Sequence, residues 1–338
     1  MDQDTKDIGR ELAAAGESLD LSRKELAKRI IGQREMIDGL LMALIAGGHI
    51  LLEGVPGLAK TLAVKSLAEI TGLTFKRIQF TPDLLPADLT GTLIWEQASL
   101  TFSVRKGPVF AHVILADEIN RAPAKVQSAL LEAMEERQVT IGENSYPLPD
   151  PFFVLATENP IEHEGTYALP EAELDRFLLK LLVQYPSPEE EIRILHQPAP
   201  VPLAPVLPLP VLERLRTLAE GIYVDEKIAR YMVSVVAATR PAAKTGGLRS
   251  GDVEEKPGRE GPYRYISFGA SPRASIALYR CSRIRALFDG RPFVTPEDVK
   301  AVALPVLRHR IVLSYEAEAD GLNSDGIISR ILAFIPVP

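Results

Sequence analysis

The sequence has little cysteine, few aromatic residues and no long apolar run. Its one cysteine, Cys281, excludes a disulfide within the chain and is typical of a reducing compartment. No apolar stretch approaches the roughly 20 residues that a membrane-spanning helix needs. The N-terminus is acidic and lacks the basic and apolar order of a secretory signal. We therefore expect a cytoplasmic protein with no transmembrane segment.

An excess of basic residues is also missing. The 338 residues include 38 Lys and Arg against 45 Asp and Glu, which gives a net charge of −7. Dedicated nucleic-acid binders usually present a basic face, so this balance argues against a nucleic-acid partner. The composition, 46% hydrophobic and 25% charged, is that of an ordinary globular protein. A chain of this length is expected to form two domains, each with its own core.

The segment 54–61, Gly-Val-Pro-Gly-Leu-Ala-Lys-Thr, follows a short apolar run and precedes a stretch with helical apolar spacing. Glycine lets backbone N–H groups turn toward phosphate oxygens, and the helix N-terminus adds its positive dipole end. The segment therefore predicts a phosphate-binding loop. In such a loop Lys60 reaches the β- and γ-phosphates, and the hydroxyl of Thr61 binds Mg²⁺. The motif is incomplete on its own, because Ala59 stands where the general pattern has its last glycine.

An acid pair, Asp117 and Glu118, ends a continuous apolar run that predicts a strand buried on both faces, as in a parallel sheet. Ligands of open α/β sheets bind at the carboxyl ends of the strands. Asp117 is therefore expected to hold Mg²⁺, directly or through water. Glu118 is expected to orient and polarise the water that attacks the γ-phosphate. The alternative is that both acids cap the following helix.

Two further candidates follow. Asn159 comes after the apolar run 152–156, and it shares the attacking water with Glu118 if the two strands are neighbours. Taken alone, Asn159 is also a common turn former before proline. Arg176 precedes the last candidate strand, residues 177–182. It matters for catalysis only if the protein forms rings, and otherwise it is an ion-pair partner of Asp175 or Glu173.

The rest of the chain divides by composition. We expect N-terminal amphipathic helices at 1–30, packed on the next domain, an α/β core at 31–185, a proline-rich connector at 186–210 and an all-helical domain at 211–338. Residues 92–110 and 138–146 predict hairpins. The glycine-rich segment 241–262 predicts a mobile loop. Residues 75–80 alternate like a further strand.

Four smaller features of the sequence also carry predictions. In the helical domain, Ser271 suits an N-cap, which leaves Arg273 free to point out of the helix end. Ile31 and Gly32, ahead of the phosphate loop, could flank an adenine ring or form a plain turn. The candidate metal ligands His49, His112 and His163 match no zinc spacing, so we expect structural roles for them and no metal except magnesium.

The ordered motifs resemble those of AAA+ ATPases, and more narrowly of the MoxR family. Residues 54–61 resemble its Walker A loop, in which alanine at the position of Ala59 is usual, and residues 113–118 resemble Walker B. Asn159 resembles the sensor 1 residue, Arg176 the arginine finger and Arg273 the sensor 2 residue. Residues 78–86 and 169–177 are close to family signatures. The expected nucleotide contacts are Ile31, Gly32, Gly54, Pro56, Gly57, Leu58, Ala59, Lys60, Thr61, Leu62 and Asp117.

This resemblance implies a P-loop core with a five-stranded parallel sheet flanked by helices, a smaller all-α lid domain and assembly into rings, commonly hexamers. It implies ATP and Mg²⁺ as cofactors and a nucleotide at the subunit boundary. Arg176 or Arg121 of one protomer would reach the neighbour's γ-phosphate there. The implied role is an ATP-hydrolysing, chaperone-like remodeller working with von Willebrand factor A domain partners. A chelatase-like motor subunit and a nucleotide-gated scaffold remain alternatives.

Overall fold

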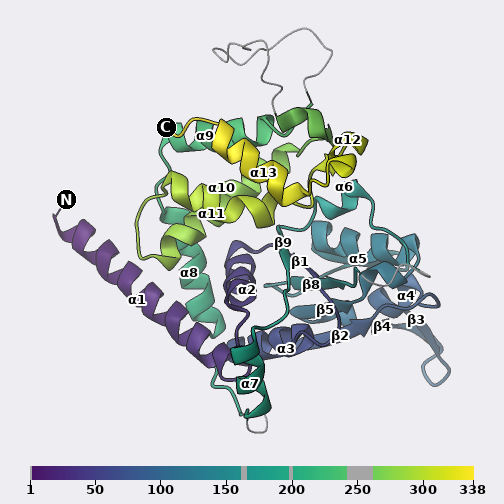
Figure 1. Cartoon of the computed structure of the whole chain (residues 1–338). Coiled ribbons are helices and arrows are strands. Elements are labelled where there is room, and N and C mark those ends of the chain that lie inside the picture. The colour runs from purple at the N-terminus through teal and green to yellow at the C-terminus, as the bar shows by residue number, and fades with distance from the viewer. Residues whose placement is uncertain (1, 161–165, 198–200, 242–261) are drawn as a thin grey trace.

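The computed structural model describes residues 2–160, 166–197, 201–241 and 262–338. Its centre is the predicted five-stranded parallel sheet, with strand order β2-β5-β8-β1-β9 (Figure 1). The strands are β1 (Ile50–Glu53), β2 (Phe75–Gln79), β5 (Val113–Asp117), β8 (Phe153–Glu158) and β9 (Leu179–Leu182). The three central strands consist almost wholly of buried residues, as their continuous apolar runs predicted.

Helices cover both faces of this sheet. On one face lie α2 (Arg34–Ala46) and α3 (Lys60–Thr71), whose apolar residues share a core with β1 and with the C-terminal domain. On the other face lie α4 (Pro86–Thr90) and α5 (Ala124–Glu136), in a separate apolar cluster. In α5 the stripe of Val126, Leu130 and Met134 is buried, as its helical spacing predicts. The two cores hold the strand ends, and therefore the site, in fixed positions.

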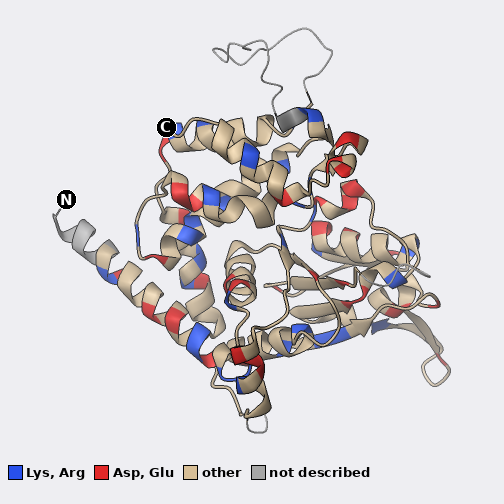
Figure 2. Ribbon diagram, viewed as in Figure 1, with Lys and Arg blue, Asp and Glu red and all other residues tan. Residues whose placement is uncertain are grey.

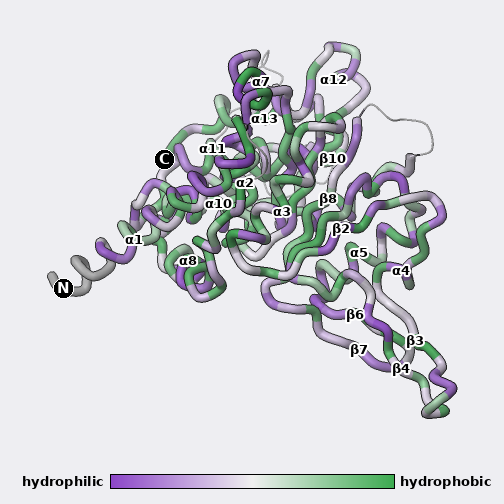
Figure 3. Tube along the Cα trace, turned by 90° about the horizontal axis from the view of Figure 1, so that it is seen from below, coloured by the Kyte–Doolittle hydropathy of each residue, from purple (hydrophilic) through white to green (hydrophobic). Residues whose placement is uncertain are grey.

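Two hairpins are inserted into the core, as predicted. They are β3 (Gly91–Glu96) with β4 (Thr101–Lys106), and β6 (Gln138–Ile141) with β7 (Asn144–Pro147). They project together from one end of the molecule (Figure 3). Gly142, in the turn between β6 and β7, has φ +65°, and a Cβ there would lie 2.7 Å from a methyl carbon of Leu93. Glycine therefore lets the two hairpins touch.

The C-terminal domain is helical. Its helices are α8 (Leu209–Gly221), α9 (Glu226–Ala237), α10 (Pro272–Phe288), α11 (Pro296–Leu307), α12 (Tyr315–Ala319) and α13 (Ser324–Phe334). As predicted, Ser271 caps α10 and Cys281 is buried in its core stripe. One departure is a short antiparallel ribbon of β10 (Ile266–Phe268) and β11 (Val312–Leu313). Strands of three and two residues are too short to give a recognisable alternation.

The N-terminal residues form a single helix, α1 (Asp2–Ala27), that packs on α3, α8 and α10 and so bridges the two domains (Figure 1). The connector contains α7 (Pro188–Leu195), whose first turn is held by a capping box at Ser187. A four-residue helix, α6 (Glu171–Leu174), precedes β9, and single 3₁₀ turns lie at Pro108–Phe110, Ile119–Arg121 and Pro262–Tyr265. The expected mobile loop falls on 242–261, outside the described residues.

Within the part of the chain that the structure describes, no helix is long and apolar enough to cross a membrane.

Candidate active site

The phosphate loop connects β1 to α3 at the carboxyl edge of the sheet. Gly57 has φ +88° and nothing within 4 Å of a built Cβ, so its backbone faces open space. Ala59 adopts the left-handed conformation with φ 58°, which the general motif normally assigns to glycine. The loop thus takes the expected turn, and the N-terminus of α3 with Lys60, Thr61 and Leu62 follows directly.

Lys60 is half-buried and its ammonium donates a hydrogen bond to the carbonyl of Gly54. Burial lowers the pKa of Lys60, while the negative charges of Asp117, Glu118 and Glu53 oppose that shift. The lysine therefore lies among the acids at the edge of the sheet. It supplies a positive charge where a triphosphate would bring negative charge.

Asp117 and Glu118 stand at the end of β5, and Thr157 of the neighbouring strand β8 joins them. The Thr157 hydroxyl donates to Asp117 Oδ1 at 2.7 Å and accepts the backbone N–H of Glu118 at 2.8 Å. Glu118 has φ 56°, and its side chain makes no capping hydrogen bond to the 3₁₀ turn that follows. The alternative that this acid caps the following helix is therefore wrong, and its carboxylate instead accepts a hydrogen bond from Gln79 of β2.

Two residues of β2 donate hydrogen bonds to the acid pair, and the sequence alone assigns them no role. Gln79 donates to Glu118 Oε2 at 2.8 Å, and Arg77 donates to Asp117 Oδ2 through two nitrogens, at 3.0 and 2.6 Å. Gln79 pairs directly with Asp117 in the parallel register of β2 and β5. Knowledge that β2 pairs with β5 would have indicated that these two residues lie beside the acid pair.

Asn159 is buried and follows the end of β8, the strand that pairs with β5, at whose end Asp117 and Glu118 stand. The two strands are therefore neighbours, as the proposed sharing of the attacking water between Asn159 and Glu118 requires. Glu158, one residue earlier, has its pKa raised by burial, with Lys180 opposing this shift. Lys180 Nζ lies 2.6 Å from Glu53 and 3.8 Å from Glu158, which makes this acid cluster ion-paired.

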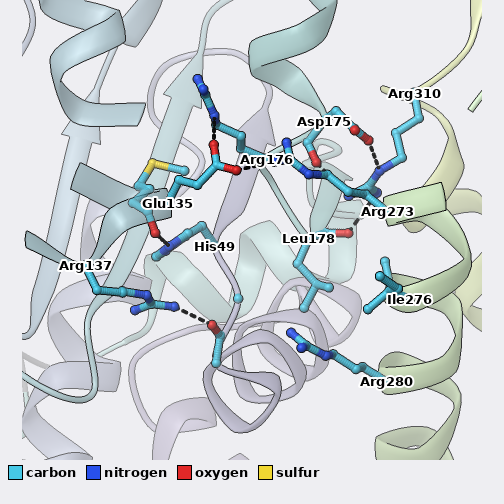
Figure 4. Close-up of a pocket in the computed structure, with 14 residues that line it drawn as sticks. His49, Glu135, Arg137, Asp175, Arg176, Leu178, Arg273, Ile276, Arg280 and Arg310 are labelled. Carbon is cyan, nitrogen blue, oxygen red and sulfur yellow. Dashed lines mark hydrogen bonds and ion pairs between the residues drawn. The ribbon is translucent and has the colours of Figure 1, made fainter. Parts of the chain in front are cut away.

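Arg176 and Arg273 lie at the opposite edge of the sheet. In the parallel register of β1 with β9, Ile50 pairs with Leu179 and Glu53 with Leu182, so Arg176 precedes the strand starts while the phosphate loop follows the strand ends. The four-residue strands alone separate the two edges by roughly 10 Å. Both arginines bind Glu135 (Figure 4). Arg273 thus points out of the end of α10 toward α5, and the alternative that Arg176 pairs with Asp175 or Glu173 is wrong.

Family models match two parts of the chain. Residues 49–179 match the ATPase family associated with various cellular activities (AAA), and residues 263–331 match the AAA lid domain. The chain is 47% identical over 329 residues to chaperone MoxR1 of Mycobacterium tuberculosis, covering 97% of this chain and 84% of that protein. It is also 34% identical to protein MoxR of Paracoccus denitrificans, covering 91% and 93% of the two chains. The chain belongs to the MoxR family of AAA+ ATPases.

A solved structure agrees with this assignment. The crystal structure of a candidate ATPase from Cytophaga hutchinsonii superimposes with a TM-score of 0.87 at 43% identity and covers 99% of each chain. The chain is thus a MoxR-type ATPase with an AAA core and a helical lid, and it binds nucleotide. The predicted fold class and family are confirmed.

The turn ahead of the MoxR core lies beside the connector. Gly32 has φ +69°, and a Cβ there would lie 2.5 Å from a carboxylate oxygen of Glu190 in α7. The amide of Gln33 donates to the carbonyl of Gln184 at 2.8 Å. Ile31 and Gly32 therefore belong to a turn packed on α7, and their contact with adenine remains a prediction.

The histidines have the structural roles that were expected of them where the structure describes them. His49 is buried between the carbonyl of Met134 and the N–H of Val154, and burial lowers its pKa to about 3. His112 bonds to Thr74. His163 lies outside the described residues. No group of three His, Cys, Asp or Glu able to hold a metal occurs among the residues described.

The residues at the carboxyl edge fit a magnesium nucleotide. Asp117 Oδ1 accepts one hydrogen bond, from Thr157, which leaves a second acceptor position for a water of a hydrated cation. Thr61 is exposed on the first turn of α3. Oxygen donors of this kind, combined with the open backbone at Gly57, suit Mg²⁺ carried with phosphates.

Proposed function

We propose that this MoxR-type ATPase is a remodeller that uses ATP hydrolysis to help partner proteins mature or become active. The name of the Mycobacterium tuberculosis relative, a chaperone, supports this role. Acidic and basic residues are interspersed over the ribbon in Figure 2, and the net charge is −7, which favours protein clients over nucleic acid. Proteins with von Willebrand factor A domains are the partners that we propose, on the family resemblance alone.

The observation that carries the proposal is the arrangement at the carboxyl edge. Glu118 would accept the proton of the attacking water while Gln79 and the Thr157 hydroxyl hold its carboxylate and backbone in place. Lys60 would bind the β- and γ-phosphates, and Asn159 would help to position the water. Thr61 and Asp117 would hold magnesium, which neutralises negative charge on the phosphates when bound. Positioning and charge stabilisation are what phosphoryl transfer needs.

A second copy of the chain would complete the site. Arg176 and Arg273 lie at the edge opposite their own phosphate loop, so they would serve the nucleotide of an adjacent subunit in a ring. Arg121, the other candidate for this role, lies 3.2 Å from Glu118 of its own subunit. That position favours Arg176, together with Arg273, as the pair acting across the boundary. A hexamer is the ring size we propose from the family.

The substitution Glu118→Gln tests the chemistry. It keeps the size of the side chain but removes the proton acceptor, so ATP should still bind while hydrolysis falls by ~10² or more. Binding is measured by titration with a fluorescent ATP analogue and turnover by phosphate release. Lys60→Ala is the control that should lose binding itself. Near-normal hydrolysis by Glu118→Gln would remove Glu118 from the role of base.

A further inference from the structure

One carboxylate at the amino edge of the sheet joins the core to the lid. Glu135, near the end of α5, accepts a hydrogen bond from Arg176 Nε at 2.6 Å through Oε2, and from Arg273 Nη2 through Oε1. Arg176 comes from the core and Arg273 from the first turn of lid helix α10. Figure 4 shows the Glu135 carboxylate between the two guanidinium groups. Neither the family match nor the sequence motifs assign Glu135 a role.

The surroundings of Glu135 carry an excess of positive charge. A pocket of about 250 Å³ is lined by Arg137, Arg176, Arg273, Arg280 and Arg310 against only two acids, Glu135 and Asp175. His49 in the same pocket is neutral at pH 7 because burial lowers its pKa to about 3. The hydrogen bond from Arg176 lowers the pKa of Glu135, with the charge of Arg273 adding to it, so the carboxylate is ionised. The net charge of these lining residues is +3, which suits a polyanion.

The helix end that carries Glu135 is firmly held. His49 bonds to the carbonyl of Met134, the residue before Glu135, at 3.3 Å. Arg137, at the C-cap, donates to the carbonyls of Phe152 and Gly47, at 2.5 and 2.6 Å. These bonds tie the end of α5 to the segments that lead into β8 and β1. Glu135 therefore stands on a rigid base, which is what a group that orients other side chains requires.

The contact with Arg176 leaves its phosphate-binding atoms available. Only Nε of Arg176 is used by Glu135, and its terminal nitrogens donate to no other described residue. A guanidinium held by Nε keeps its terminal pair for bidentate contact with a phosphate. Arg273 likewise binds Glu135 through one nitrogen.

We propose that Glu135 is a positioning residue that holds Arg176 and Arg273 as one pair, set to contact the triphosphate bound by the adjacent copy of the chain. This inference rests on the proposed shared site. Without the carboxylate, two like charges at close range would repel and the arginines would swing apart. Each would then have to be ordered again for every turnover, and the lid would lose the ion pair that Arg273 makes with α5 of the core.

The test compares Glu135→Ala with Glu136→Ala, which makes the same charge change at the next residue of α5. Glu136 is exposed and makes no ion pair with a described residue. Glu135→Ala should lower kcat by at least about tenfold, less than the ~10³-fold loss expected for an arginine finger itself. The affinity and stoichiometry for a fluorescent ATP analogue should stay unchanged. Glu136→Ala should match the unsubstituted protein in both measurements.

A second measurement separates positioning from a structural role. In a chain that already carries Arg176→Ala and Arg273→Ala, adding Glu135→Ala should lower the residual rate no further, because its two partners are gone. A further loss there, or loss of nucleotide binding by Glu135→Ala alone, would assign Glu135 a structural role and overturn the inference. A normal rate for Glu135→Ala beside a defective Arg176→Ala would also overturn it and leave the shared site intact. A normal rate for Arg176→Ala would instead contradict the shared site itself.

Discussion

At the scale of single residues, the proposed site depends on side chains that hold Asp117 and Glu118 in place. Asp117 and Glu118 are adjacent in sequence but are oriented by a hydroxyl from another strand, Thr157, and by the amide of Gln79. A hydroxyl that donates to one group and accepts from another cannot be replaced by an apolar side chain without leaving both unpaired. We therefore expect the positions of Asp117 and Glu118 to depend on the hydroxyl of Thr157, although Thr157 is an ordinary strand residue in the sequence.

Thr157→Val preserves the shape of the side chain and removes the hydroxyl. We expect a loss of about 1–3 kcal/mol in stability from the unpaired N–H of Glu118, and a fall in ATP turnover of ~10-fold or more as the acid pair loses its common partner. Thr157→Ser, which keeps the hydroxyl, should retain most of both. The measurements are urea unfolding and phosphate release. Equal turnover in the two variants would show that the hydroxyl is not needed.

The buried histidines make stability depend on pH. Burial lowers the pKa of His49 to about 3, so the folded protein keeps it neutral while the unfolded chain takes up a proton below its ordinary value near 6.5. Unfolding is thereby favoured as pH falls below 6.5. As pH falls from 7 to 5.5, protonation of His49 in the unfolded chain should lower the free energy of unfolding by about 1 kcal/mol.

His49→Gln, which titrates nowhere in this range, should flatten the dependence by that amount in urea titrations at the two pH values. His309, whose pKa burial also lowers, should act in the same direction. An unchanged pH dependence in His49→Gln would contradict the neutral state assigned to His49.

The sequence allows a role to be predicted for a residue when that role follows from the residues next to it in the chain. The phosphate loop and the acid pair follow apolar strands directly, so their position at the carboxyl edge could be inferred. The roles of Gln79, Thr157 and Glu135 depend on which strands and helices lie side by side, which local spacing does not contain. Asn159 was predictable only as far as the adjacency of β5 and β8 could be assumed.

At the scale of elements, an internal ion pair fastens the lid to the core. Arg310, after α11, donates from Nε to Asp175 Oδ1 at 2.8 Å, and Asp175 Oδ2 accepts from Ser271, the N-cap of α10. The Arg310 side chain is only 3% exposed, so its charge depends on this partner. Asp175 immediately precedes Arg176. Lid position and arginine position are therefore linked through one loop.

Asp175→Asn should cost about 3 kcal/mol, because it leaves the buried Arg310 charge without a counter-ion. The free energy of unfolding is measured with urea. Glu226→Gln breaks an exposed pair with Arg230 in α9, whose side chains are 75% and 77% exposed, and should change stability by less than about 1 kcal/mol. Adding Arg310→Met to Asp175→Asn should recover part of the loss. Equally small effects of Asp175→Asn and Glu226→Gln would show that the ion pair between Asp175 and Arg310 contributes little to stability.

The elements themselves were largely predictable, with two limits. The three central strands follow from continuous apolar runs, β2 from its alternation, and both hairpins from turn residues. The sequence does not predict the ribbon of β10 and β11, because strands of three and two residues are too short to show an alternation of apolar and polar residues. The placement of α10 against the amino edge of the sheet also escaped prediction, since it follows from the packing of the lid on α2 and from the ion pairs at Asp175 and Glu135.

At the scale of the whole molecule, the two groups of proposed site residues lie at opposite edges of one sheet. The phosphate loop, Asp117 and Glu118 lie at the carboxyl edge, and Arg176 and Arg273 lie at the amino edge. In this arrangement Arg176 and Arg273 lie away from the phosphate loop of their own subunit. The central claim is that the site that hydrolyses ATP is divided between two copies of the chain.

Mixing two inactive variants tests this claim most directly. Lys60→Ala removes nucleotide binding but keeps the arginine edge, whereas Arg176→Ala combined with Arg273→Ala keeps the nucleotide site and loses the arginine edge. Each alone should show little phosphate release. The equimolar mixture should regain a substantial part of the wild-type rate, because each intact nucleotide site can meet an intact arginine edge. No gain on mixing, or full activity of the double arginine variant alone, would contradict the account.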